Sequence, residues 1–552
     1  LRYRQRIAQL MLRTAERQAP PPSAPRAMGE AMTFTLPAEE PAVASVNPNQ
    51  RDTPLRIAAR LQRRAAVVQI TAGLAFGLAA ALWQCLGFGF QPTPIRLLVM
   101  GWSWSWPTVL ALGLVWEGDR RRTLLAWAAY LAGGVLICLL VALGPTPPLT
   151  MRGIQIPAFF QGPVMWATDL AFAPLLLLFL NRAIRSVAPA MFVILLMAML
   201  GAQAAFVIAS TPLGLWALSW LAFLHLPMIG LLAVPQLIGM LAALPIAWWL
   251  LGRLRAAYSA KWISDQSLIL DTLWAFQSGL FAFQLTQDLG AAGWWGGALF
   301  LVYKAIALAG MAPAAWAARR HKPWRLLLLR VVTRRDRWGR QHSRRFASER
   351  LFDVLACRWR AIGPITMIGA PDLASSTITP EEFLDFLVGK LRERFILDQA
   401  EVPPRLAALD DRPDPDARWR VSEFFCGKDT WHQAVEGLMG RCDLVAMDLR
   451  DFGPDNLGCL LELQSLVDIV PLERCALLID DSTRRDVLEA TLKNCLARTY
   501  PTAPNGRDQI MPIVINVTQG EREAVDQLLC LAPNPPAGRT GPPDLPTAAP
   551  TD

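Results

Sequence analysis

Eight long apolar runs between residues 65 and 318 constrain this chain more than any other feature. The runs are 65–90, 97–116, 124–144, 164–181, 188–211, 228–252, 266–288 and 294–318. Each is close to the roughly 20 residues that a helix needs to cross a bilayer. Only 18% of the 552 residues are charged and 53% are hydrophobic, whereas a soluble domain carries about 25% charged residues. The sequence therefore predicts a helical multi-pass membrane domain over residues 56–318 and excludes an ordinary cytosolic enzyme.

Basic residues between the runs indicate how the chain crosses the membrane. Lys and Arg stay on the cytoplasmic side, and they cluster at Arg56, Arg60, Arg63, Arg64, Arg120, Arg121, Arg122, Arg182, Arg185, Arg253, Arg255 and Lys261. The uncharged stretch 212–252 is long enough for one span or two. Because Arg185 and Arg253 both lie inside, we expect one crossing at about 228–252 and an interfacial piece at 213–226. This gives eight spans, with both termini cytoplasmic, in the inner membrane of a bacterium.

The run 266–288 is the weakest predicted span, because it carries Asp271, Gln277, Gln284 and Gln287. An ionisable group inside a membrane is a candidate functional group. Asp271 falls about one helical turn from the expected span end. Two interpretations therefore stay open, namely placement near the membrane surface or membership of a polar pathway.

The remaining segments include two tails and a basic linker. Residues 1–55 and 532–552 are rich in proline and lack periodicity, which predicts disordered tails. Residues 319–360 hold 14 Lys and Arg against three acidic residues, a net +11, whereas the whole chain carries +9. Basic clusters beside a span bind anionic lipid head groups at roughly 1 kcal/mol per residue. The residues expected to contact lipid are Arg319, Arg320, Arg334, Arg335 and Arg337.

Nucleic acid is the alternative partner for such a basic segment. The position directly after a span, the interleaved Trp324 and Leu326–Leu329, and the lack of any nucleic-acid-binding motif favour lipid. We therefore expect the lipid bilayer and its anionic head groups as partners, and no nucleic acid.

Residues 361–531 have a different pattern, in which short apolar runs alternate with segments of helical period. This alternation is typical of a parallel sheet with crossover helices. Strands are expected at 364–368, 419–425, 443–448, 475–480 and 509–517, each followed by a helix. Five such units predict a flavodoxin-like, doubly wound α/β domain on the cytosolic side.

Ligands of doubly wound sheets bind beyond the carboxyl ends of the strands. The candidate ligand-binding residues near those ends are Gly369, Asp372, Asp429, Asp448, Asp455, Asn456, Cys459 and Asp480. Neither G-x-G-x-x-G nor G-x-x-x-x-G-K-[ST] occurs, so the common dinucleotide and phosphate loops are excluded. No cysteine pair has C-x-x-C spacing, and we expect no metal site.

The segment CDLVAMDLRDFGPDNLGCLLELQSL, residues 442–466, resembles the TIR domain family. Cys459-Leu-Leu-Glu462-Leu463 corresponds to the Cys-x-x-Glu-Leu part of the family signature, while Gly458 stands where the family usually has Trp. The resemblance implies self-association and NAD as a substrate. It also implies that Glu462 is catalytic and stabilises an oxocarbenium-like transition state during nicotinamide–ribose cleavage. The alternative role of Glu462 is to complement the helix dipole.

Three functions follow as hypotheses. The first is a membrane-tethered TIR-like effector that cleaves NAD or signals in stress or defence. The second is a non-enzymatic membrane sensor or scaffold whose α/β domain binds a nucleotide or a protein partner. The third is a transporter with a regulatory domain.

Overall fold

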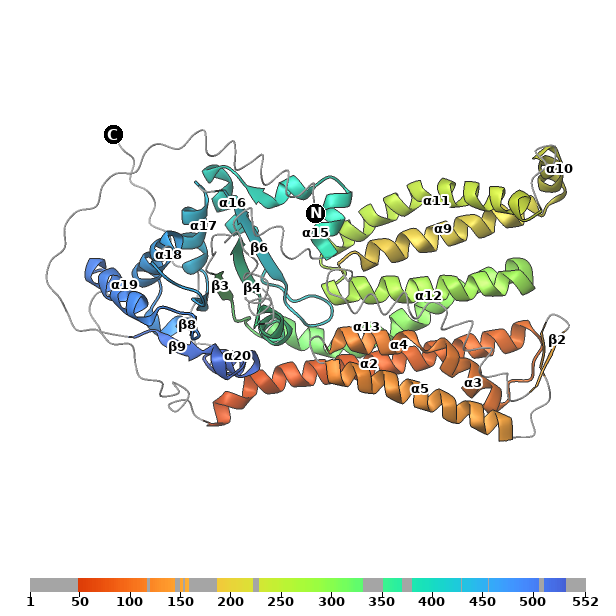
Figure 1. The fold of residues 1–552 in the computed structure, drawn as a ribbon, viewed down its shortest axis with the longest axis horizontal. Helices are drawn as coiled ribbons and strands as arrows, with labels where there is room; N and C mark the ends of the chain where they lie inside the picture. The colour runs from red at the N-terminus through yellow and green to blue at the C-terminus, as the bar shows by residue number, and fades with distance from the viewer. Residues whose placement is uncertain are drawn as a thin grey trace.

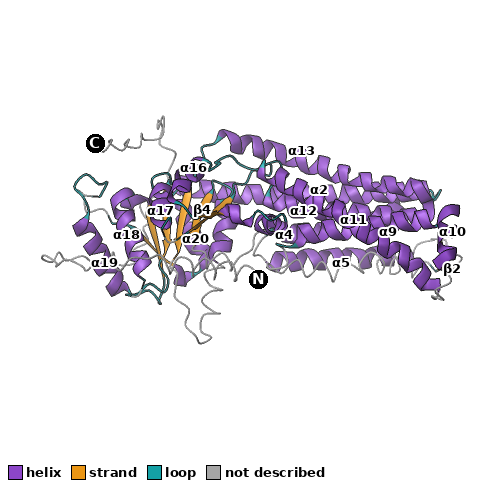
Figure 2. Ribbon diagram, turned by 90° about the horizontal axis from the view of Figure 1, so that it is seen from above, coloured by secondary structure: helices purple, strands orange, loops and turns teal. Residues whose placement is uncertain are grey.

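The computed structural model describes residues 48–116, 120–143, 149–151, 154–157, 186–221, 228–330, 351–369, 380–427, 429–454, 456–505 and 511–532. A bundle of long helices and an α/β domain lie end to end (Figure 1). The strands of the larger sheet are confined to one end of the molecule (Figure 2). The predicted tails lie outside the described residues, apart from their inner edges. Helix α2 begins at Pro48, so residues 48–55 are helical and their assignment to a tail is wrong.

The bundle contains helices that are long and apolar enough to cross a membrane. Among the described residues, six single helices qualify, and the bent pair α3 and α4 passes the same test when the two helices are counted as one span. The helices are α2 (Pro48–Gly87), α3 (Pro94–Trp104), α4 (Pro107–Val115), α5 (Arg120–Leu143), α9 (Ala188–Ala209), α11 (Met228–Ser259), α12 (Asp265–Leu289) and α13 (Leu299–Arg320). Seven predicted runs therefore coincide with candidate spans, and the run 164–181 lies outside the described residues. By helix length and composition, the chain is a multi-pass membrane protein.

The ambiguous stretch 212–252 contains a short helix and a long one. Helix α10 (Pro212–Leu221) exposes Trp216 and Trp220, and only the α11 part is long enough to span. The described part of this stretch therefore contains one candidate span, and the expectation of a single crossing stays a prediction. Shorter elements complete the bundle, namely the hairpin β1 (Leu149–Met151) and β2 (Ile154–Ile156), and the turn η4 (Gly290–Ala298) between α12 and α13.

Helix α12 is the central helix of the bundle. It has the lowest mean hydropathy of the candidate spans, 1.2, yet the largest buried share of its residues, 83%. It packs against α2, α4, α9, α11 and α13. A helix that faces protein rather than lipid can carry polar side chains inward. This explains why the weakest span in the sequence belongs to the interior.

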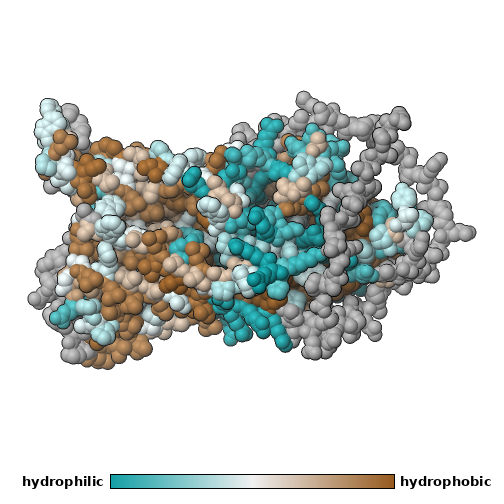
Figure 3. All heavy atoms as spheres, turned by 180° about the vertical axis from the view of Figure 1, so that it is seen from behind, coloured by the Kyte–Doolittle hydropathy of each residue, from teal (hydrophilic) through white to brown (hydrophobic). Residues whose placement is uncertain are grey.

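Helices α9 and α11 approach closely through glycines. A Cβ at Gly201 would lie 2.3 Å from the carbonyl oxygen of Gly239, and one at Gly239 would lie 2.2 Å from the carbonyl oxygen of Gly201. Such small-residue contacts are typical of membrane helix pairs. The outer surface of the bundle is mostly apolar, and polar side chains gather next to it toward the α/β domain (Figure 3).

The α/β domain is built on a seven-stranded parallel sheet. The spatial order is β5 (Phe395–Ile396), β6 (Val421–Cys426), β4 (Ile365–Gly369), β3 (Leu326–Arg330), β7 (Leu444–Asp448), β8 (Cys475–Ile479) and β9 (Ile513–Asn516). The five strands expected from the sequence are present, and β3 and β5 are additional. Strand β3 is central and pairs with β4 on one side and β7 on the other.

Strand β3 corrects the domain boundaries, because it lies in the segment 319–360 that the sequence predicted as a basic linker. Residues 351–359 of that segment are helical as well. The strand is buried on both faces: Leu326 and Leu328 enter one hydrophobic core, and Leu327 and Leu329 enter the other. A continuous apolar run is typical of a central parallel strand, whereas the sequence interpretation assigned these leucines to lipid.

Helices cover both faces of the sheet, as expected of a doubly wound fold. One face packs against the helical residues 351–359, against α20 (Glu521–Cys530) and against Leu55 at the start of α2. The other face carries α16 (Val402–Ala407), α17 (Trp431–Met439), α18 (Leu457–Ile469) and α19 (Arg485–Arg498).

The strand order differs from the flavodoxin-like arrangement expected from the sequence. Without the edge strand β5, the order of the strands by chain position is 3-2-1-4-5-6. This is the order of dinucleotide-binding folds, whereas flavodoxin-like sheets are ordered 2-1-3-4-5. The difference arises because β3 separates β4 from β7.

Candidate ligand-binding edge and junction with the membrane helices

The carboxyl ends of β3 and β7 mark the point where the strand order reverses. From β3 the chain builds β4 and β6 on one side, and then adds β7, β8 and β9 on the other. Ligands of open α/β sheets bind outside the carboxyl ends at such a switch point. Arg330 ends β3 and is in register with Asp448, which ends β7. These two residues therefore lie where the fold places its ligand.

Asp448 is held by Arg450, two residues further along the chain. The guanidinium Nε and Nη2 lie 2.8 Å and 2.7 Å from the two carboxylate oxygens, and the side chains are only 9% and 7% exposed. Burial acts to lower the pKa of Arg450, but the hydrogen bonds and charge of Asp448, with the charges of Asp480 and Glu521, raise it overall. Arg450 thus fixes the orientation of Asp448 at the switch point.

The loops after β7 and β8 form one connected unit. Three hydrogen bonds join them: Asp451 N–H to Ser482 Oγ (2.9 Å), Thr483 Oγ1 to the Leu449 carbonyl (3.0 Å), and Arg484 N–H to the Phe452 carbonyl (3.0 Å). Asp480 accepts the backbone N–H of Ser482 at 2.9 Å. Asp451 has φ +63°, a left-handed conformation that is uncommon for a residue other than glycine. The edge around Asp448 and Asp480 is therefore preorganised.

The other predicted residues of the edge are more scattered. Gly369 ends β4, beside β3, whereas Asp429 follows β6 and Asp372 lies outside the described residues. Strands β4 and β3 separate Asp429 from Asp448, and three strand spacings amount to roughly 14 Å. The structure therefore groups Asp448 with Asp480 but does not bring Asp429 to the same place.

Residues at the start of α18 have mainly structural contacts. The Asn456 side chain accepts the backbone N–H of Gly453 at 2.8 Å and so shapes the loop. Cys459 is buried in the hydrophobic core beneath the helix. Asp455 lies outside the described residues.

Glu462 is a buried carboxyl group. Its side chain lies five residues into α18, roughly 8 Å along the helix axis, and only 7% of the residue is exposed. Among the described residues, Oε2 has no hydrogen-bond partner. Burial raises the pKa of Glu462 to about 8, so the group is mostly protonated at pH 7. A neutral carboxyl stabilises neither a developing positive charge nor a helix dipole, and the two roles predicted for Glu462 both need the ionised form.

The amino ends of the strands face the membrane helices. Arg360, before β4, places Nη2 2.6 Å from the Asp265 carboxylate at the start of α12. Arg420, before β6, donates to the carbonyls of Tyr258 and Ile263 at 2.8 Å and 3.0 Å. Its guanidinium also lies 3.8 Å from the centre of the Tyr258 ring. Because all strands are parallel, the carboxyl edge points away from the bundle.

A buried ion pair fixes Arg420 in this junction. The Asp414 carboxylate lies 2.9 Å from the Arg420 Nε and its side chain is fully buried. Burial raises the pKa of Asp414 to about 6, although Arg420 acts to lower it. Removing one member of a buried pair typically costs about 3–5 kcal/mol. Asp414 therefore holds Arg420 in the position from which it bonds to the carbonyls of Tyr258 and Ile263.

Helix α15 (Pro380–Leu387) makes the second contact of the junction. Leu384 is buried in a cluster that contains Val193 of α9 and Leu251 of α11. The neighbouring Asp385 forms ion pairs with Arg255 of α11 and with Arg394. This crossover helix therefore docks on the membrane helices.

The arginines predicted to contact lipid separate into two groups. Arg319 and Arg320 end α13, and the Arg320 guanidinium lies 3.5 Å from the centre of the Trp316 ring; lipid contact there stays a prediction. Arg334, Arg335 and Arg337 lie outside the described residues and follow the carboxyl end of β3. The carboxyl end of β3 points away from the bundle. The direction of the chain therefore gives no reason to place these three arginines next to the membrane.

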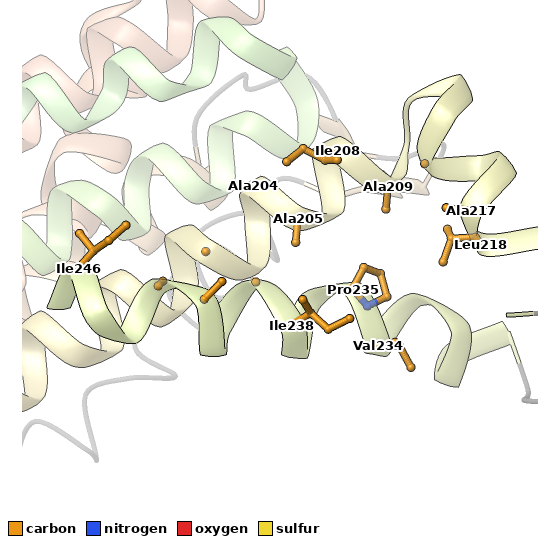
Figure 4. A pocket seen from close by; sticks show the side chains of 15 residues that line it. Ala204, Ala205, Ile208, Ala209, Ala217, Leu218, Val234, Pro235, Ile238 and Ile246 are labelled. Carbon is orange, nitrogen blue, oxygen red and sulfur yellow. The ribbon is translucent and has the colours of Figure 1, made fainter. Parts of the chain in front are cut away.

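An apolar pocket of about 550 Å³ lies between α9, α10 and α11 (Figure 4). Small and aliphatic residues line it, including Ala205, Pro235 and Ile238. All of its lining residues are apolar or glycine. It has no side chain that could orient a polar ligand, and we attribute the pocket to the close packing of small residues.

The sequence interpretation missed the residues that organise both the edge and the junction. The unbroken run Leu326–Leu329 was the available signal for the central strand and hence for Arg330. No comparable signal marks Arg255 and Asp385, which are 130 positions apart. Comparison of the chain with protein-family models, with curated proteins and with solved structures finds no match.

Proposed function

We propose that this protein is a membrane-embedded sensor whose α/β domain binds a nucleotide at the carboxyl edge beside β3 and β7. The observation that carries the proposal is the strand order, which puts Arg330, the last residue of β3, at the switch point. In this fold the first strand–helix connection accommodates the ligand's phosphate groups. The nucleotide would bind on the cytosolic side, at the edge remote from the membrane.

The residues after β3 supply positive charge in place of the usual glycine-rich loop. Residues 331–350 contain seven arginines and two acidic residues. Arginine is the side chain best suited to bidentate contacts with phosphate. The sensor role is supported by the junction, because Arg360 and Arg420 contact the bundle directly from the amino ends of β4 and β6.

The test measures nucleotide binding by the full chain in nanodiscs of phosphatidylcholine, where no anionic lipid competes. ATP and NAD are the probes, and calorimetry reports the dissociation constants. Replacing Arg334, Arg335 and Arg337 by Ala should weaken binding by about tenfold for each charge-assisted hydrogen bond to phosphate that the substitutions remove. A control variant with Ala at Arg319, Arg320 and Lys322 removes the same number of charges and should bind like the wild type.

Two results would contradict the proposal. One is the absence of heat and of any melting shift with both probes. The other is equal weakening in the two triple variants, which would mean that overall charge rather than a site determines binding.

NAD cleavage is the second candidate function, favoured by the strongly perturbed Glu462, since perturbed groups cluster at active sites. The TIR-like resemblance implies that this activity needs self-association. Incubating the full chain at high density in vesicles with NAD would then release nicotinamide, and Glu462→Gln would stop it. We favour binding without cleavage because a buried, protonated Glu462 lacks the charge that the chemistry needs.

A further inference from the structure

A polar network crosses three helices inside the bundle. Lys304 of α13 forms an ion pair with Asp271 of α12, and the Tyr303 hydroxyl donates a hydrogen bond to the same carboxylate. Gln69 of α2 donates in turn to Tyr303. Asp271 is six residues beyond Asp265, which places it roughly 9 Å into the bundle from the junction. Ionisable groups at such depth are costly and are candidate functional groups.

A fully buried amide lies deeper on the same helix. Gln277 is 0% exposed, and its side-chain nitrogen and oxygen both lack a hydrogen-bond partner among the described residues. It is twelve residues from Asp265, roughly 18 Å along the axis, near the middle of a bilayer core about 30 Å thick. Burying such a group without partners costs several kcal/mol.

Gln277 faces a break in a neighbouring span. Helices α3 and α4 are bent by 50° where they meet, and the break lies between Trp104 and Trp106. On α12, Gln277 is four residues after Leu273, which belongs to the same buried cluster as Trp106, and four before Phe281, whose ring centre lies 4.6 Å from that of Trp104. Helical spacing therefore puts Gln277 on the strip of α12 that covers the break.

Other unpartnered polar atoms lie at the break itself and on α2, α4 and α12. Trp106 Nε1, Thr108 Oγ1, Trp274 Nε1 and Gln69 Oε1 are buried without a hydrogen-bond partner among the described residues. Trp274 stacks on Tyr303 with ring centres 5.0 Å apart, which joins the break to the ionic network. Buried polar groups of this kind are satisfied by internal water, and broken membrane helices commonly line ion and substrate sites.

We propose that the α3–α4 break and the Asp271–Lys304 pair form a hydrated proton-transfer site inside the membrane domain. Water at the break bonds to Gln277, and the Asp271–Lys304 pair exchanges protons with it. Proton uptake by Asp271 breaks the ion pair, and Lys304, now unpaired in a low dielectric, releases a proton to water. Transfer of the proton from Asp271 to Lys304 restores the pair, so one proton enters and one leaves. Among the described residues, the charged groups that face the site are Asp271 and Lys304, with Tyr303 as the other titratable group.

The experiment measures proton flux through the full chain in phosphatidylcholine liposomes that contain a pH-sensitive dye. A potassium gradient with valinomycin drives the protons. The interior of liposomes that contain the wild-type protein should acidify or alkalinise faster than that of empty liposomes, according to the sign of the potential. Asp271→Asn should reduce the flux by about a hundredfold, which is typical for loss of a positioned proton-transfer group.

Two further variants separate proton transfer from folding. Gln277→Leu has a similar size and removes the unpaired amide, so it should reduce the flux without lowering thermal stability. The matched control is Ser278→Ala, whose hydroxyl bonds only to the Trp274 carbonyl within the helix, and it should retain the flux. If Asp271→Asn misfolds, the double variant with Lys304→Met leaves no unpaired charge and should fold without conducting.

The outcome decides the proposal in either direction. Wild-type flux no greater than that of empty liposomes overturns it, as does undiminished flux in folded Asp271→Asn and Gln277→Leu proteins. An infrared carboxyl band that appears on acidification in the wild type and is missing in Asp271→Asn supports it independently of flux. Nucleotide binding by the α/β domain is not required for any of these results.

Discussion

Replacing Glu462 by Gln should change how the stability of helix α18 depends on pH. The folded protein holds this carboxyl with a pKa of about 8, raised by burial from 4.5. Between these two pH values the folded form binds more protons than the unfolded form, so stability falls as pH rises and levels off above about pH 8. The Gln variant has no proton to lose and should show no such fall.

The magnitude follows from the two pKa values. One pKa unit is worth ~1.4 kcal/mol, so the full penalty approaches about 5 kcal/mol above pH 8. That figure is a ceiling, because partial opening of α18 would admit water. Between pH 6 and pH 8 the wild type should lose about 2 kcal/mol relative to Glu462→Gln, because the group is already half ionised at pH 8.

Hydrogen exchange of α18 amides measures the effect locally in the full chain. The opening free energies of wild type and Glu462→Gln should agree near pH 5 and diverge toward pH 8. The matched control is Glu473→Gln, an exposed carboxyl of the same domain, which should follow the wild type. Parallel curves for wild type and Glu462→Gln would refute a buried, neutral carboxyl, and would restore the case for an ionised catalytic group.

Three further substitutions test the packing. Arg420→Ala leaves the buried Asp414 unpaired and should destabilise the junction by about 3–5 kcal/mol, which faster proteolysis between the two parts would report. Gly201→Leu must displace the backbone of α11 and should cost at least about 1–3 kcal/mol in detergent melting; Gly252→Ala, with open space around it, should be neutral. Leu327→Ala removes buried side-chain volume from the central strand and should cost about 2–5 kcal/mol; unchanged melting would place β3 outside the core.

The fold was predictable where the signal is local. Apolar runs of span length located six candidate spans and the bent pair α3 and α4 among the described residues, and the alternating pattern located five strands to within a few residues. The candidate site was predictable in part, because Asp448 and Asp480 end or follow strands. Cys459 and Glu462 also stand near a strand end in the sequence, but the helix turns both toward the interior.

The sequence by itself determined which segments are apolar and whether their apolar residues repeat with the period of a helix or of a strand. What it left undecided is which surface covers each apolar segment. Leu326–Leu329 suits lipid and a sheet interior equally well, and pairing with β4 and β7 decided the matter. The polar residues of α12 make this run the weakest predicted span in the sequence, and they become interior groups only because five helices pack around α12. Partners distant in sequence, such as Arg255 and Asp385, meet only in the folded chain, since the energy of an ion pair depends on distance in space.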